Sequence, residues 1–67
     1  MIYALYEIGK SVEWDTIRIF TSFSSLEQKM VRDKLKNYYA VAYDGVDELV
    51  PVWCYQLSKG KLERFSL

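Results

Sequence analysis

Apolar residues recur at helical spacing in one stretch of the chain, residues 24–37. Four of them lie at i, i+4, i+5 and i+9, which forms one broad stripe when successive residues are drawn about 100° apart. A stripe of this kind predicts a helix with one buried face. Its members are Leu26, Met30, Val31 and Leu35.

Polar residues predict where this helix begins and ends. Ser24 followed by Glu27 matches a capping box, in which the Ser24 hydroxyl accepts the amide hydrogen at position 27 and the Glu27 carboxylate reaches back. Lys34 and Lys36 suit a last turn, where the partial negative end of the helix dipole favours cations. Asn37 is a suitable residue at which to leave the helix, so we expect it to run from Ser24 to Asn37.

The other stretches are continuously apolar or alternate between apolar and polar residues over the length of a strand. Residues 2–8 are apolar on both faces, which suits a central strand better than an edge strand. Asp44-Gly45 indicates a turn, followed by a longer acidic loop, and Pro51 suits a strand start or an edge. The expected strands are residues 2–8, 16–21, 38–43 and 52–57, with an optional fifth at 62–65.

This order of elements predicts an α+β fold in a single domain, residues 1–67. A helix with one apolar stripe and a sheet with an apolar face escape water by covering each other. We therefore expect an antiparallel sheet of four to five strands, in the order ββαββ(β), with one helix packed on one face.

The short chain limits the size of the core. A chain of about 60 residues buries only about 60% of the surface that its unfolded form exposes. One cysteine excludes an internal disulfide, and the chain has no histidine for a metal site, so we expect self-association, as a homodimer, or a partner protein. The single cysteine and the lack of a leader-like first segment predict a cytoplasmic protein. The longest apolar run, residues 52–55, is far shorter than the roughly 20 residues that span a bilayer.

Charge gives one alternative function. The formal net charge is zero, which gives little counterion release and does not favour binding to nucleic acid. A basic helix stripe is nevertheless spaced at i, i+3 and i+7, and further basic residues lie near the end of the sequence. The stripe is either a solvated helix face or the contact of a small nucleic-acid-binding module. The residues of this alternative are Lys29, Arg32, Lys36, Lys59, Lys61 and Arg64.

No residue pattern predicts catalysis, a metal or a cofactor. Asp44, Asp47 and Glu48 cluster after the fourth expected element, but their spacing does not match a calcium loop. They form either a solvated turn or a surface that docks on a basic partner. Cys54 has no histidine to act as its base, so it is expected to be a small buried residue. We expect a protein that is not an enzyme.

Aromatic residues are too numerous for a core of this size: the chain has eleven, of which six are tyrosines. Tyrosine and tryptophan on a sheet face that the helix leaves uncovered are typical of a protein interface. Stacking on single-stranded bases is the competing use of such a face. The candidate protein-binding residues are Trp14, Tyr38, Tyr43, Trp53 and Tyr55, together with Asp44, Asp47 and Glu48.

Two segments carry a resemblance to known proteins. Residues 2–7, Ile-Tyr-Ala-Leu-Tyr-Glu, and residues 19–27, which run from a strand into the helix, resemble short uncharacterised phage and bacterial ββαβ accessory proteins. The resemblance implies a phage-encoded protein of the host-takeover or anti-defence type, acting in the host cytoplasm by inhibiting or modulating a host protein. No functional residue carries over from it. A purely structural homo-oligomer is the remaining hypothesis.

Overall fold

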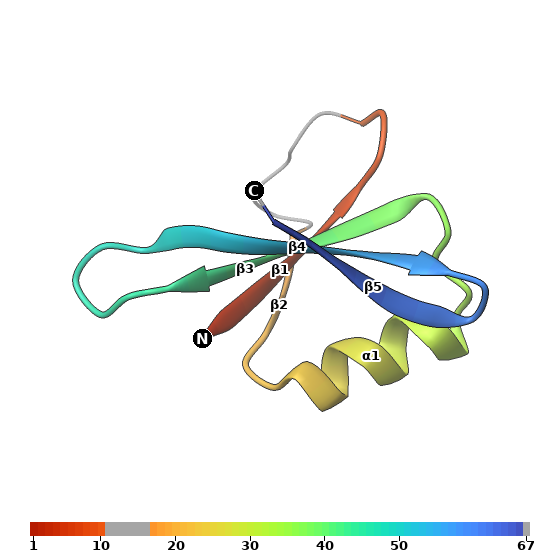
Figure 1. The fold of residues 1–67 in the computed structure, drawn as a ribbon, viewed down its shortest axis with the longest axis horizontal. Helices are drawn as coiled ribbons and strands as arrows, with labels where there is room; N and C mark the ends of the chain where they lie inside the picture. Colours follow the sequence, from red (N-terminus) through yellow and green to blue (C-terminus); the bar gives the residue numbers. More distant parts are fainter. Residues whose placement is uncertain (11–16, 67) are drawn as a thin grey trace.

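The computed structural model describes residues 1–10 and 17–66, and it confirms an α+β fold with one helix and one antiparallel sheet (Figure 1). The elements of these residues follow in the order β1, β2, α1, β3, β4 and β5. Their bounds are β1 Ile2–Glu7, β2 Arg18–Phe20, α1 Phe23–Arg32, β3 Tyr38–Asp44, β4 Val50–Ser58 and β5 Lys61–Ser66. The expected second strand began at Thr16, which lies outside the described residues.

The sheet has five strands in the order β2-β1-β3-β4-β5, and every neighbouring pair is antiparallel. β1 lies between β2 and β3, which confirms that the first strand is not at an edge: Tyr3 is opposite both Phe20 and Ala42. The fifth strand forms as expected and pairs with β4 across the turn Lys59-Gly60. Both turn residues have a positive φ, of 52° and 78°, as a type I′ hairpin turn requires.

The start of α1 differs from the expected capping box. The N-cap is Ser22, whose backbone is extended and whose hydroxyl accepts a hydrogen bond from the Ser25 amide at 3.4 Å. Phe23 already lies in the helix, so Ser24 and Glu27 belong to its first turns and do not cap it. The expected start was therefore wrong, because Ser22 two residues earlier offers the same hydroxyl.

The helix ends at Arg32, five residues before Asn37. Lys34 takes a left-handed conformation with φ 52°, and the Leu35 amide donates to the Met30 carbonyl at 3.0 Å while the Lys34 amide donates to Val31 at 3.3 Å. These two bonds form a Schellman motif, which usually carries glycine at the left-handed position. Because lysine occupies this position instead of glycine, the sequence did not indicate that the helix ends here.

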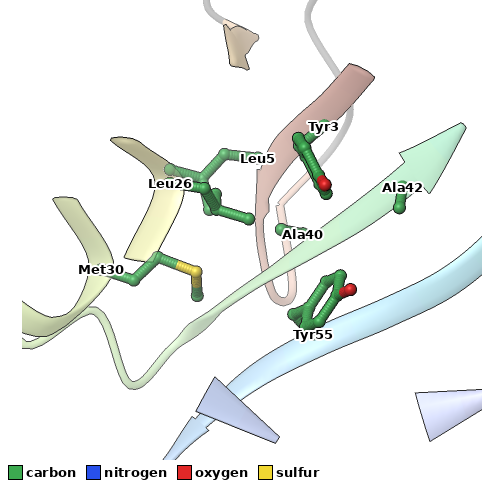
Figure 2. Close-up of a cluster of buried hydrophobic side chains, with 7 residues drawn as sticks. All are labelled: Tyr3, Leu5, Leu26, Met30, Ala40, Ala42 and Tyr55. Carbon is green, nitrogen blue, oxygen red and sulfur yellow. The ribbon is translucent and has the colours of Figure 1, made fainter. Parts of the chain in front are cut away.

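The core lies between α1 and one face of the sheet (Figure 2). Leu26 and Met30 are completely buried and project from α1 toward the strands. Ala40 and Ala42, also fully buried, lie on the facing strand β3, where their small side chains let the helix approach closely. The remaining members of this core cluster are Tyr3, Leu5 and Tyr55.

The helix covers only one side of the sheet. α1 contacts both edge strands, β2 and β5, and Figure 1 shows the helix on a single side of the strands. Of the expected helix stripe, Val31 remains 37% exposed, and Leu35 packs against the core from just beyond the helix end. The second face of the sheet is left without a covering element from the described residues.

Candidate functional site

The uncovered face of the sheet, called here the open face, follows from strand alternation. Side chains point to opposite faces at successive positions of a strand, so the neighbours of the core residues point away from α1. Ala4, for example, is opposite Ile19 on one side and Val41 on the other, and none of the three belongs to the core cluster. The open face consists of Ile2, Ala4, Tyr6, Ile19, Tyr39, Val41, Tyr43, Cys54, Gln56, Glu63 and Phe65.

A pocket of about 300 Å³ opens on this face over β1 and β2. Ala4 is only 4% exposed and lies between the larger side chains of Ile2 and Tyr6 on the same strand face, so its short side chain leaves a depression. The volume is at the lower end of the roughly 300–1,000 Å³ of small-molecule pockets. This apolar pocket is lined by Ile2, Ala4, Tyr6, Ile17, Ile19, Tyr43 and Leu49.

Tyrosine hydroxyls supply the polar side-chain atoms of the pocket lining. The Tyr6 and Tyr43 hydroxyl oxygens are 3.0 Å apart and hydrogen-bonded, and the Tyr6 ring stacks on Tyr39 at 5.3 Å between centroids. Burial, followed by the hydrogen bond with Tyr43, raises the pKa of Tyr6 to about 12. Tyr6 is therefore neutral at physiological pH, and the lining offers hydrogen bonds without charge.

An acidic loop adjoins the apolar pocket. Residues 45–49 connect β3 to β4, and the longer acidic loop expected after Asp44 is present. Tyr43 and Leu49 line the pocket, so the loop that carries Asp47 and Glu48 adjoins it, whereas Asp44 follows Tyr43 on β3 and alternates to the other face. All three acids are exposed, and none takes part in an ion pair among the described residues.

The described aromatic candidates do not share one face. Tyr55 is opposite Ala40 and is 9% exposed, so it is a core residue and cannot belong to an open contact surface. Trp53 is opposite Ala42 on the same side, half-buried, with the Arg64 guanidinium 4.1 Å from its ring centroid. Tyr38 also lies on the helix side.

The Tyr38 hydroxyl donates to Glu7 at 3.2 Å. Of the described aromatic candidates, Tyr43 alone is on the open face. Trp14 lies outside the described residues. The alternation that sets Ala40 and Ala42 against the helix carries Tyr38, Trp53 and Tyr55 to the same side, which corrects the expected grouping.

The basic residues do not form a single stripe. α1 ends at Arg32, so Lys36 is in the following turn and not on a helix face with Lys29, which corrects that expectation. Lys29 forms an ion pair with Asp33 at i+4, as the spacing allows, and Arg32 pairs with the same carboxylate at 3.2 Å. Hydrogen bonds from Lys29 and then Arg32 hold the pKa of Asp33 below its usual value.

The second basic group lies on the β4–β5 hairpin. Lys59 is in its turn and Lys61 begins β5, whereas Arg64 packs over Trp53 on the helix side of the sheet. The six basic candidates are therefore divided between the end of α1 and the last hairpin.

Cys54 is half-buried and not fully buried as expected. Cys54 is on the open face opposite Val41 and Phe65, and burial raises the pKa of its thiol, which disfavours the thiolate that a nucleophile needs. Across the described part of the chain, no group of three or more histidine, cysteine, aspartate or glutamate side chains is placed to hold a metal ion.

Most of the pocket residues were not among the sequence candidates. The alternating isoleucines at positions 17 and 19 and the small Ala4 between two bulky neighbours were the available signals. Their grouping depends on the register that sets β2 beside β1, which periodicity does not give.

Scans against protein-family models, curated proteins and solved structures give no match for the chain. Within residues 1–10 and 17–66, no helix has the length and apolar character needed to cross a membrane.

Proposed function

We propose that the chain is a small non-catalytic binding protein that holds a partner protein on its open face. The observation that carries this proposal is the apolar pocket, because exposed apolar side chains gathered at one place on a surface are typical of an interaction site. Ile19 at 56% exposure and Leu49 at 50% are large apolar side chains that face solvent at its border. Burying them against a partner is favourable.

The partner proposed here presents an apolar side chain flanked by lysine or arginine. The apolar chain enters the pocket, and the basic group approaches the acidic residues Asp44, Asp47 and Glu48, of which the last two are on the adjoining loop. Residues 38–57 contain these three acids and no lysine or arginine, so this part of the surface attracts cations and disfavours phosphates. That distribution supports a protein partner over a nucleic acid.

The resemblance to phage accessory proteins extends the proposal. Under it, the partner is a host or defence protein, and covering part of that protein inhibits or modulates it. The small size of the domain fits such a role, because occupying a surface needs no chemistry of its own.

Selection from a random peptide library on the immobilised protein tests the proposal. Enriched peptides should contain a large apolar residue next to lysine or arginine, and their binding should weaken as salt concentration rises. Enrichment of acidic or featureless peptides, or of none, would contradict it.

A matched pair of variants locates the contact. Ile19→Lys puts a charge at the pocket, whereas Val31→Lys makes the same kind of change on the outer surface of α1, where Val31 is 37% exposed. The selected peptides should bind the Val31→Lys protein like the wild type and bind Ile19→Lys at least about tenfold more weakly. Equal affinity for both variants would place the contact elsewhere.

A further inference from the structure

The free edge of β5 is a second feature that the open face does not explain. β5 is the last strand of the sheet and pairs with β4 alone, so no strand of the described residues lies along the outer side of its backbone. It is six residues long, Lys61–Ser66, against three for β2 at the opposite edge. Unpaired backbone groups along an edge are a template for another strand.

Symmetry restricts how two β5 strands can meet. A two-fold axis perpendicular to the sheet brings β5 antiparallel to its copy and sets residues of one sheet face opposite each other. One residue of β5 then lies at the axis, directly opposite the same residue of the other copy. Four interior positions of the strand are available: Leu62, Glu63, Arg64 and Phe65.

Charge distinguishes these four registers. With Leu62 on the axis, Lys61 of each copy is opposite Glu63 of the other, which gives two attractive pairs and no repulsive one. With Glu63 or Arg64 on the axis, that residue is opposite its own copy, and like charges directly opposite each other are destabilising. With Phe65 on the axis, Arg64 is opposite Ser66, and no oppositely charged pair forms among the described residues.

The charged residues of the favoured register are free to pair. Lys61 and Glu63 are both exposed, and neither takes part in an ion pair among the described residues. Leu62, on the other sheet face, is only partly buried against the core, and meeting its copy removes more of its surface from water.

We propose that two copies of the chain associate through β5, with Leu62 on the two-fold axis and reciprocal Lys61–Glu63 pairs, to form one continuous sheet. This edge is separated from β1 and β2 by β3 and β4, so the apolar pocket stays open in the dimer. The inference is independent of the function proposed above.

Charge reversal with rescue tests this arrangement. Sedimentation equilibrium of the full chain at low salt should show a dimer for the wild type. Lys61→Glu and Glu63→Lys each turn both attractive pairs into repulsive ones, so each should raise the dissociation constant roughly fivefold or more. The double variant K61E/E63K exchanges the charges, restores both pairs and should dimerise like the wild type.

Two controls complete the test. Lys36→Glu changes the net charge as Lys61→Glu does but lies in the turn before β3, so it should leave the dimer unchanged. Far-UV circular dichroism should show that all variants fold, because both reversed side chains are exposed. A monomeric wild type, a dimer indifferent to single reversals, or a double variant without recovery would each overturn the proposal.

Discussion

Leu26 and Ile19 are both large aliphatic residues, but they lie on opposite faces of the sheet. Leu26 is completely buried between α1 and the strands, whereas Ile19 is 56% exposed at the border of the apolar pocket. Truncating each to alanine therefore compares the cost of a core cavity with the cost of a lost surface group.

The expected magnitudes differ clearly. Leu26→Ala should cost about 2–5 kcal/mol of unfolding free energy, because Ala40 and Ala42 belong to the sheet and cannot move in to fill the space. A domain of 67 residues has a total of only about 3–10 kcal/mol at roughly 0.05–0.15 kcal/mol per residue. Ile19→Ala should cost about 1 kcal/mol, since less than half of the roughly 1.5–3 kcal/mol available from full burial is lost.

Thermal unfolding followed by circular dichroism measures both. At about 4–8 °C per kcal/mol for a domain of this size, Leu26→Ala should lower the midpoint by roughly 10 °C or more, or leave the chain unfolded. Ile19→Ala should lower it by less than about 8 °C. An Ile19→Ala protein as unstable as Leu26→Ala would refute the assignment of the two faces.

Three further predictions concern other parts of the structure. Gly45→Ala should destabilise the protein by about 1–3 kcal/mol in urea unfolding, because φ is +129° and the new Cβ would clash with the Glu48 carbonyl oxygen. Gly9→Ala, with φ +85° and open space around the new Cβ, should cost less unfolding free energy. Equal costs for the two variants would contradict the predicted clash. The raised pKa of Tyr6, about 12 against 10.0 for the free side chain, stabilises the fold fully below pH 10, and this contribution is lost as pH rises through 12. In an absorbance titration at alkaline pH, the Tyr6→Phe variant should lack the tyrosine ionisation that occurs at the highest pH in the wild type. Loss of an ionisation at lower pH would contradict the raised pKa of Tyr6. Because burial raises its thiol pKa, Cys54 should react with a disulfide reagent at pH 8 more slowly in the folded protein than in urea; an equal or faster rate would contradict its environment.

Periodicity and turn residues were sufficient for the order of the elements. The i, i+4 spacing of Leu26 and Met30 identified the buried helix face, and Asp44-Gly45 marked the acidic loop. The helix ends were not predictable in the same way, because Ser22 and Ser24 offer the same cap chemistry and Lys34 occupies a position where glycine is the usual signal.

The site was less accessible from sequence than the fold. β1 and β3 carry apolar or aromatic residues on both faces, so alternation alone does not show which face the helix covers. Ala40 and Ala42 decide this on β3, because their small, fully buried side chains let α1 approach that strand closely, and the pairing of β3 with β4 then carries Trp53 and Tyr55 to the helix side. Their assignment required the register between strands.

Isoleucine methyl groups offer the most direct test of binding at the apolar pocket. Three of the four isoleucines, at positions 2, 17 and 19, line the pocket, and Ile8 lies outside it at 48% exposure. In methyl-labelled protein titrated with a peptide recovered from the selection, the NMR signals of Ile2, Ile17 and Ile19 should shift together while Ile8 stays in place. Saturable shifts that leave the three pocket methyls unmoved would contradict the proposal that this face holds the partner.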